Sequence, residues 1–514
     1  MNTAPSAQTQ QGIYIGQRKT VNGTGVNYWY GIPYAQQPIG RLRWMPPQQL
    51  PTSHGTRYAL IPNVCPQKND FRIVFTESCL TLNVYTPMNA NNLPVYVWIH
   101  GGSFTTGAGV EYDAASFVSV SVKNSVPIVV VTINYRLGLL GFLADEALYE
   151  ERSGVNNRST TGNYGILDQM MAVDWIKKNA AGFGGDPGQI TIGGESAGGV
   201  GVTILLTSPL TTNGTFQRAI IESGGLWPSA ATPLEKAINS SGKILRVMAN
   251  CTTVQCLRTI TVEMILTVQN FIASHSIFGA SAMPVIDGYV LNDIMEDSYV
   301  RGSFQRVPVL IGSTTNETSL FTCPIFNQTA SAAQVEIFLS TLVNTTVLNE
   351  ITSIYGPIST YPNPLIYLNI IYSDSWAHCG SRRIASRFAD HGLPAYFYTY
   401  DHLIPIAPHC LGVAHAAELP MLFPDLLPFV YPFYKFNALE KQLSISMTLY
   451  WANFIHTSDP NFRGNPTHWD PYQNSSDGDL VLDISSQMRY HHYDFVCSRL
   501  WDRYAQTSSI LLSS

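Results

Sequence analysis

A serine stands between glycines where a predicted strand becomes a predicted helix. The stretch reads Gly194-Glu195-Ser196-Ala197-Gly198; a β-prone run precedes it and an apolar, helix-like run follows it. Gly-x-Ser-x-Gly in this setting is the pattern of a nucleophile elbow, a tight turn that presents a serine hydroxyl at a helix N-terminus. A glycine-rich loop capped by serine would give the same letters, but the flanking strand and helix favour the nucleophile. Ser196 is therefore the candidate nucleophile of an acyl transfer.

Acyl transfer also needs hydrogen-bond donors for the oxyanion that forms. A second glycine pair, in the stretch VWIHGGSF at 97–104, also follows a predicted strand. We predict that the main-chain N–H groups of Gly102 and Ser103, together with that of Ala197, form the oxyanion hole. His100 is interpreted as a residue that orients this loop rather than one that transfers protons.

The serine needs a general base and an acid that orients it, in the chain order serine, acid, histidine. His409 and His415 both lie in a loop after the predicted strand 395–400. Glu317 and Asp401 are the acid candidates that follow predicted strands. Spacing alone does not choose within either pair.

The elements that must position these groups alternate between strands and helices. The N-terminal part is predicted to form antiparallel strands that turn at Asn22-Gly23. A helix is predicted over 166–183, ended by glycines, and the segments from about 230 to 305 and from about 325 to 390 are predicted to be helical insertions over the strand ends. Short Val/Ile-rich runs, typical of strands buried on both faces, occur at 95–99, 127–135, 190–192, 218–222, 307–312 and 395–400.

This alternation predicts an α/β protein with a large, mostly parallel sheet covered by helices on both faces. We expect residues 1–514 to form a single domain, since no repeat or low-complexity linker divides the chain.

Composition narrows the function classes. The chain has 514 residues, of which 45% are hydrophobic and 12% charged, and its net charge is -6. No Lys/Arg-rich run supports a nucleic-acid partner, and no apolar run of about 18 residues predicts stable membrane insertion. The N-terminus lacks the pattern of a signal peptide, so either none was present or this is a mature form with an added Met.

Cysteines and glycosylation sequons favour a secreted glycoprotein. Eight cysteines, an even number that includes two close pairs, suit disulfides and an oxidising compartment. A chain rich in Ser, Thr and Asn could also produce sequons by chance. The sequons begin at Asn22, Asn157, Asn213, Asn239, Asn250, Asn316, Asn327, Asn344 and Asn474.

Several long motifs, in one consistent order, resemble the type-B carboxylesterase family, the cholinesterase and fungal lipase branch of the α/β-hydrolases. The resemblance covers most of the chain and is strongest in the first 225 residues. The motifs are YGIPYAQQPIGRLRWMPPQ (30–48), ESCLTLNVYTP (77–87), WIHGGSF (98–104), NYRLGLLGFL (134–143) and GNYGILDQMMAVDWIKKNAAGFGGDPGQITIGGESAGG (162–199).

The resemblance resolves the choices that spacing leaves open. The family's acid lies in a stretch that matches GSTTNET, which implies Glu317, and its histidine in a stretch that matches GVAHAAELP, which implies His415. Glu195 matches a family carboxylate that tunes the site electrostatically, although a glutamate paired in the first helical turn is an equal reading. Ser223 matches a serine that supports the triad from behind.

The resemblance also implies ion pairs and disulfides that stabilise the structure. It implies the ion pairs Arg43–Glu77 and Arg136–Asp168. The implied disulfides are Cys65–Cys79, Cys251–Cys256 and, by a looser match, Cys379–Cys497. The remaining Cys323 and Cys410 follow the acid and precede the base, so we expect a fourth bridge that braces these two loops.

Three departures from the family bear on the substrate. The first disulfide encloses only residues 66–78, where the family's lipases have a long lid, so interfacial activation is not favoured. The same loop holds no tryptophan, so a cation–π site for choline esters is not expected. Ser103 replaces the third glycine of the oxyanion loop, and its hydroxyl could add a contact.

These features predict a serine esterase that hydrolyses carboxylic esters through an acyl-enzyme, without metal or organic cofactor. A lipase or sterol esterase of the same branch is the alternative, with Trp227, Phe326 and the segment 423–434 lining an acyl channel or forming plain core. A catalytically silent adhesion-type relative is a further alternative, which the presence of all three triad residues disfavours. Acyl-chain length, alcohol preference and oligomeric state are left open.

Overall fold

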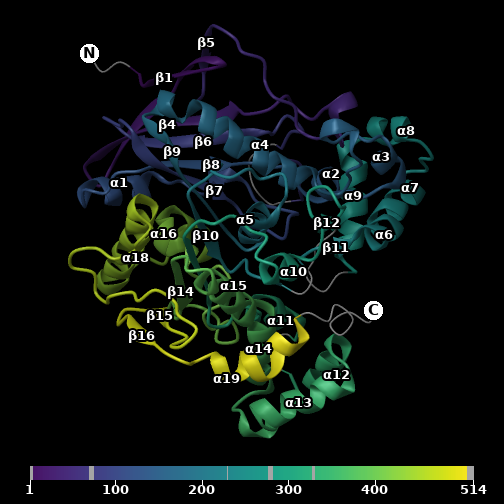
Figure 1. The fold of residues 1–514 in the computed structure, drawn as a ribbon, viewed down its shortest axis with the longest axis vertical. Helices are drawn as coiled ribbons and strands as arrows, with labels where there is room; N and C mark the ends of the chain where they lie inside the picture. Colours follow the sequence, from purple (N-terminus) through teal and green to yellow (C-terminus); the bar gives the residue numbers. More distant parts are fainter. Residues whose placement is uncertain (1–3, 69–74, 228–229, 276–281, 327–329, 506–514) are drawn as a thin grey trace.

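A twisted sheet of eleven strands runs through the computed structural model, which describes residues 4–68, 75–227, 230–275, 282–326 and 330–505 (Figure 1). The strand order is β16-β15-β14-β13-β10-β9-β7-β8-β6-β4-β3. The strands are β3 (Gln17–Val21), β4 (Thr24–Pro33), β6 (Thr81–Pro87), β7 (Leu93–Ile99), β8 (Val129–Ile133), β9 (Gly185–Glu195), β10 (Arg218–Glu222), β13 (Val309–Thr314), β14 (Ala395–Tyr400), β15 (Asp479–Leu482) and β16 (Gln487–Arg489).

The centre of the sheet is parallel and its edges are antiparallel. The strands from β8 through β7, β9, β10, β13 and β14 to β15 pair in parallel, whereas β3, β4, β6 and β16 pair antiparallel. The hairpin of β3 and β4 turns at Asn22-Gly23, as expected. All six runs predicted as strands are confirmed, and β9 extends up to the residue before Ser196. The α/β fold class is therefore confirmed.

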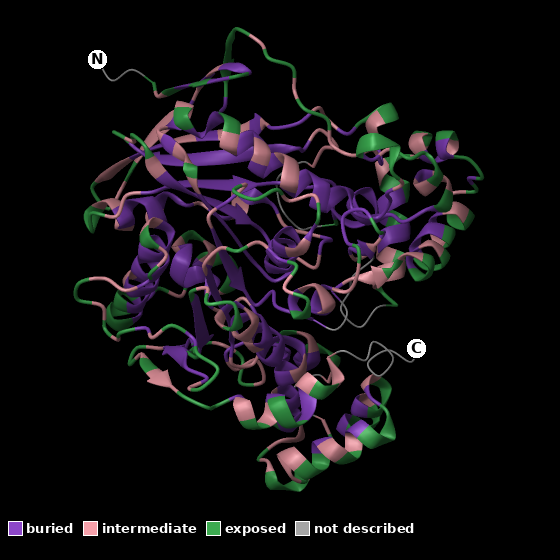
Figure 2. Ribbon diagram, in the orientation of Figure 1, coloured by how far each residue is buried: buried purple, intermediate pink, exposed green. Residues whose placement is uncertain are grey.

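Helices pack against both faces of the sheet. On one face α4 (Tyr164–Asn179), α5 (Ala197–Thr207) and α15 (Cys379–Asp390) lie against β9, β10, β13 and β14, and on the other lie α1 (Ala115–Lys123) and α18 (Ala438–Thr457). The predicted helix at 166–183 is α4, continued by a 3-10 turn to Phe183 and ended by Gly184 at φ +81°. Strand β7 shows why two layers are needed: Val95, Val97 and Ile99 face one core, and Tyr96 and Trp98 face the other. Figure 2 shows the strands buried between these layers.

Both predicted insertions are mostly helical. The second includes the π-helical turn η7 (Asp374–His378), which packs at the carboxyl end of β13. The other helices are α2 (Gly138–Phe142), α3 (Glu146–Glu150), α6 (Leu234–Ala237), α7 (Lys243–Met248), α8 (Val254–Thr259), α9 (Val262–Ala273), α10 (Met295–Val300), α11 (Ser319–Ile325), α12 (Ala332–Leu342), α13 (Thr345–Tyr355), α14 (Pro364–Ser373), α16 (Leu419–Leu422), α17 (Leu427–Val430), α19 (Asp494–Val496) and α20 (Asp502–Tyr504). Short strands outside the main sheet are β1 (Ser6–Thr9), β2 (Gly12–Ile15), β5 (Thr56–Tyr58), β11 (Thr232–Pro233) and β12 (Val285–Ile286).

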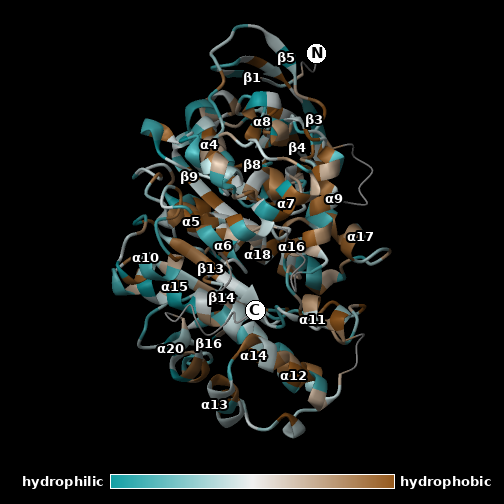
Figure 3. Cartoon of the chain, turned by 90° about the vertical axis from the view of Figure 1, so that its right-hand side faces the viewer, coloured by the Kyte–Doolittle hydropathy of each residue, from teal (hydrophilic) through white to brown (hydrophobic). Residues whose placement is uncertain are grey.

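The segment 423–434 divides between the core and the surface. Phe423 is buried and packs against the rings of Trp98 and Tyr112, with ring centroids 4.9 and 5.3 Å away. Phe429 in α17 is 75% exposed, and α17 projects from the body of the molecule (Figure 3). The segment 423–434 thus contributes one ring to the core and another to the surface.

Disulfides and ion pairs hold the loops to this framework. All eight cysteines are paired: Cys65–Cys79, Cys251–Cys256, Cys323–Cys410 and Cys379–Cys497. The ion pairs Arg43–Glu77 (2.6 Å) and Arg136–Asp168 (2.7 Å) are formed as expected. Part of the short loop inside the first disulfide, where the lipase lid and the choline-binding tryptophan were considered, lies outside the described residues.

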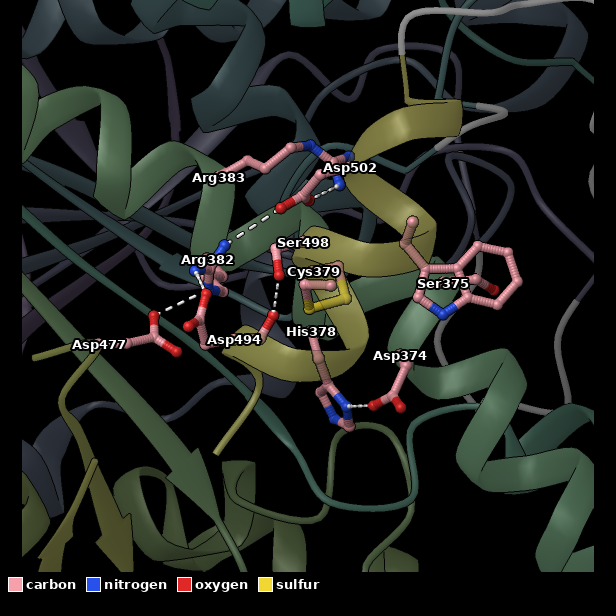
Figure 4. Close-up of a disulfide and its surroundings, with 12 residues drawn as sticks. Asp374, Ser375, His378, Cys379, Arg382, Arg383, Asp477, Asp494, Ser498 and Asp502 are labelled. Carbon is pink, nitrogen blue, oxygen red and sulfur yellow. Dashed lines mark hydrogen bonds and ion pairs between the residues drawn. A yellow bond between two sulfur atoms is a disulfide. The ribbon is translucent and has the colours of Figure 1, made fainter. Parts of the chain in front are cut away.

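The C-terminal segment is fastened to α15 by a disulfide and by ion pairs. Beside Cys379–Cys497, the guanidinium of Arg382 contacts the carboxylates of Asp477, Asp494 and Asp502 at 2.7–3.1 Å (Figure 4). Within the described part of the chain, no helix is long and apolar enough to span a membrane.

Candidate active site

Ser196 occupies a strained turn between β9 and α5. Its backbone has φ +55° and ψ -125°, a conformation that non-glycine residues rarely adopt, and its N–H donates to the carbonyl of Glu222 (2.9 Å). A Cβ on Gly194 or Gly198 would lie 2.5 or 1.9 Å from the carbonyl oxygen of Ile99. The two glycines therefore allow the turn to pack against the end of β7, which leaves the Ser196 side chain at the N-terminus of α5.

Glu317 and His415 lie in contact, although 98 residues separate them. The Nδ1–H of His415 donates to Oε2 of Glu317 (2.5 Å). The other carboxylate oxygen, Oε1, accepts from the Ser223 hydroxyl (2.6 Å) and from the N–H of Thr314 (2.7 Å). Burial alone would raise the pKa of Glu317, but His415 and these two donors outweigh burial and lower the pKa. Glu317 is thus an ionised carboxylate that fixes the tautomer of the imidazole.

The loops that carry the acid and the base are joined to each other. The N–H of Asn316 donates to the carbonyl of Val413 (2.9 Å), and the N–H of Val413 donates to Oδ1 of Asn316 (3.0 Å). Gly412 has φ +56°, and a Cβ there would lie 2.3 Å from Oδ1 of Asn316. The Cys323–Cys410 disulfide links the same two segments, as expected from its position in the sequence.

The other two candidates stand apart from this pair. His409 is exposed. The Oδ1 atom of Asp401, which is also exposed, accepts from the Thr315 hydroxyl (2.5 Å). The structure thus brings together the acid and the base that the family resemblance implied.

The second imidazole nitrogen of His415 faces Glu195. Nε2 lies 3.2 Å from Oε1 of Glu195, and among the described residues it has no hydrogen-bond partner, so the Ser196–His415 hydrogen bond is not formed in this structure. Such contacts are often loose before a substrate binds. Burial would lower the pKa of His415, but the carboxylates of Glu195 and Glu317 outweigh burial and raise it to about 9. Burial raises the pKa of Glu195 to about 7.

The glycine loop after β7 adjoins the nucleophile. Gly102 and Ser103 have φ +106° and +54°, and within the described residues no acceptor is assigned to their N–H groups. A Cβ on Gly101 would lie 2.9 Å from Cβ of Ser196, so the loop passes directly beside the serine. Ala197, the first residue of α5, adds the N–H of a helix N-terminus next to the same side chain.

His100 is built into this loop. Its Nδ1 donates to the carbonyl of Gly101 (2.8 Å), and its ring stacks on Tyr135 with centroids 4.6 Å apart. Burial lowers the pKa of His100 to about 4, so the ring is neutral at physiological pH. This environment suits a residue that shapes the loop.

Aromatic rings that the sequence analysis passed over surround His415. The Trp376 and Phe321 ring centroids lie 5.2 and 5.8 Å from that of His415. Trp376 also stacks on Trp227, with centroids 4.2 Å apart. Phe326, considered for the same channel, contacts Phe338 (5.6 Å). The only clue in the sequence to these aromatic neighbours was the position of Phe321, four residues after Glu317.

Two further buried carboxyl groups were also missed. Glu222 accepts from the indole N–H of Trp451 (2.8 Å), and burial raises its pKa to about 8. Burial also raises the pKa of Glu418 well above its ordinary value. The only clue to them in the sequence was their position: Glu222 directly precedes Ser223, and Glu418 comes three residues after His415.

Comparison with known proteins gives one consistent answer. A family model described as "Carboxylesterase family" matches residues 3–497. Liver carboxylesterase from Sus scrofa is 30% identical, with 94% of this chain and 90% of that protein covered. Para-nitrobenzyl esterase from Bacillus subtilis is also 30% identical, with 91% and 93% covered. A solved structure titled as a thermophilic PNB esterase superposes with a TM-score of 0.82 at 28% identity and covers 97% of this chain and 100% of its own. A match of this extent, on a chain with this fold, shows that the protein belongs to the carboxylesterase family.

Proposed function

We propose that the protein is a serine esterase that hydrolyses carboxylic esters through an acyl-enzyme intermediate. The observation that carries the proposal is the 2.5 Å contact between Glu317 and Nδ1 of His415, beside a serine in a positive-φ elbow. The names of the relatives, a liver carboxylesterase and a para-nitrobenzyl esterase, support an ester as the substrate.

The roles of the residues follow from their chemistry. Nε2 of His415 takes the proton of Ser196 as the hydroxyl attacks the ester carbonyl, and Glu317 stabilises the imidazolium that forms. The N–H groups of Gly102, Ser103 and Ala197 are proposed to bind the oxyanion. His415 then gives its proton to the departing alcohol, and a water molecule attacks the acyl-enzyme by the same path.

Covalent labelling tests the proposal directly. An organophosphate should react with Ser196 alone, at a stoichiometry of one per chain, because only an activated serine attacks phosphorus at a useful rate. Peptide mass spectrometry would locate the adduct, and loss of p-nitrophenyl ester hydrolysis should parallel it. An unlabelled, folded protein would contradict the serine mechanism and favour a catalytically silent relative.

Substitution of Glu195 should change the pH dependence of the reaction. His415 acts as a base only above its pKa, and the Glu195 carboxylate raises that pKa. Glu195→Gln removes the carboxylate, so the pKa of His415 should fall and the acid limb of kcat/KM should move to lower pH. The measurement is a kcat/KM profile with a soluble nitrophenyl ester. An unchanged or upward-shifted limb would show that Glu195 does not act on His415 in solution.

The four disulfides also bear on location. Structural disulfides persist in oxidising compartments and are rare in the reducing cytosol. We infer that the protein works outside the cytosol, as a secreted enzyme.

A further inference from the structure

A second histidine–carboxylate pair lies buried behind the acid of the candidate triad. In η7, Nδ1 of His378 lies 2.8 Å from Oδ1 of Asp374, one turn earlier in the chain. Both side chains are buried. Figure 4 shows the imidazole directed toward Asp374, beside the Cys379–Cys497 disulfide. The proposed reaction does not use this pair.

The hydrogen-bond partners of the pair fix where its protons are. Nε2 of His378 lies 2.8 Å from the carbonyl oxygen of Thr314, which can only accept, so Nε2 carries a proton. The indole N–H of Trp501 donates to the Tyr355 hydroxyl (2.8 Å), and that hydroxyl donates to Oδ2 of Asp374 (2.8 Å). Asp374 is therefore placed as an acceptor at one oxygen, and its other oxygen faces Nδ1. The simplest assignment gives the imidazole two N–H groups and a positive charge.

The electrostatic surroundings agree with this assignment. Burial would lower the pKa of His378, but Asp374, the Thr314 carbonyl and Glu317 outweigh burial and raise the pKa. The Tyr493 ring packs against the imidazole from the C-terminal segment, with centroids 4.8 Å apart.

Thr314 connects this pair to the candidate triad. Its carbonyl accepts from His378, and its own N–H donates to Oε1 of Glu317 (2.7 Å). Thr314 is the last residue of β13, three residues before Glu317. The position of the Glu317 carboxylate is thus set in part by a residue that His378 holds.

We propose that His378 is a buried imidazolium that acts as a positioning residue: through Thr314 it holds the end of β13, and thereby Glu317, where His415 can use it. This inference rests on the proposed function. His378 touches no reacting atom, so its effect should be on kcat rather than on substrate affinity.

The test compares His378→Gln with a matched control. Glutamine retains an N–H donor that can reach the Thr314 carbonyl, but it removes the charge. We expect kcat for a soluble nitrophenyl ester to fall about 10- to 100-fold, with KM within about twofold, as when catalytic groups are slightly misplaced. The control is His456→Gln, because Nε2 of His456 also donates to a backbone carbonyl, that of Pro127, at 2.8 Å, but the ring has no carboxylate partner among the residues that the structure describes. It should retain wild-type kcat.

A second readout separates a charge from mere structural support. A cation at His378 interacts with Glu317, the carboxylate that raises the pKa of His415, and so opposes protonation of the His415 ring. Removal of that cation should therefore raise the pKa of His415. The acid limb of kcat/KM in His378→Gln should therefore move to higher pH by about half a unit, opposite to the shift expected for Glu195→Gln. A purely structural defect would lower kcat without this shift.

The imidazole can also be observed directly in the wild-type protein. Histidine labelled with nitrogen-15 should show, at neutral pH, two N–H correlations from an imidazole other than His415, whose raised pKa also keeps two N–H groups on its ring. The pair that belongs to His378 should disappear in His378→Gln, whereas the pair that belongs to His415 should remain. Asp374→Asn should reduce the two correlations of His378 to one and lower kcat similarly. A single N–H on His378 in the wild type, or wild-type kcat and an unmoved limb in a folded His378→Gln, would overturn the proposal. Failure of the organophosphate to label wild-type Ser196 would instead refute the proposed function, and the nitrogen-15 spectrum would still report on His378.

Discussion

Ser196→Ala should lower kcat for ester hydrolysis about 10⁶-fold, the loss that follows removal of the nucleophile from a serine hydrolase. The alanine keeps the Cβ and the backbone of the elbow, so the N–H contact to Glu222 and the oxyanion donors are retained. Substrate binding should therefore survive, with KM or a substrate-analogue Kd little changed. Steady-state kinetics with a nitrophenyl ester and binding of a non-hydrolysable ether analogue would measure the two effects.

The matched control is Ser340→Ala on the exposed surface of α12, which should keep full activity. Circular dichroism and thermal unfolding should show that both variants are folded. If purified Ser196→Ala retained more than about a thousandth of wild-type kcat, another group would have to be the nucleophile, because the oxyanion hole and binding alone supply only a small residual rate.

Glu317→Gln should lower kcat about 10⁴-fold, and the hydrogen bonds around the carboxylate give the reason. Oε1 of Glu317 accepts two hydrogen bonds, from Ser223 and Thr314, so the glutamine should keep its oxygen on that side. Its NH₂ group would then donate to Nδ1 of His415. That arrangement forces the imidazole proton onto Nε2, and a protonated Nε2 cannot accept the proton of Ser196.

Rates with one ester for wild type, Glu317→Gln and the surface control Glu336→Gln would test this expectation. KM should change little, since Glu317 is fully buried and does not face the substrate. A loss of less than about tenfold would mean that the glutamate only supports the loop. In that case the tautomer argument fails.

Much of the fold could be predicted because its signals are local. Apolar runs such as 218–222 and 395–400 became β10 and β14 with the predicted bounds, since a strand buried on both faces can contain few polar residues. The glycines around Ser196 predicted the elbow because a close backbone approach excludes a Cβ. The fourth disulfide was also predictable, from the positions of two leftover cysteines near the acid and the base.

Features that depend on side-chain direction were not predictable. The i, i+4 spacing of Asp374 and His378 is common on helices, and nothing in it reveals that the carbonyl of Thr314 lies opposite. The sequence likewise could not show that Nε2 of His415 faces Glu195, or that Trp376 stacks on Trp227. These contacts depend on how insertions of many residues fold back over the sheet.

The Cys323–Cys410 bridge has a consequence beyond the folded state. Along the backbone the proposed acid and base are 98 residues apart, but across the bridge Glu317 lies only six residues from Cys323 and His415 only five residues from Cys410. In an unfolded chain that keeps this bond, the carboxylate and the imidazole remain tethered neighbours, which removes most of the entropy of closing the long loop between them. The disulfide thus keeps the proposed acid and base close to each other even in the unfolded chain. An oxidised chain that refolds therefore does not have to close the long loop between them again.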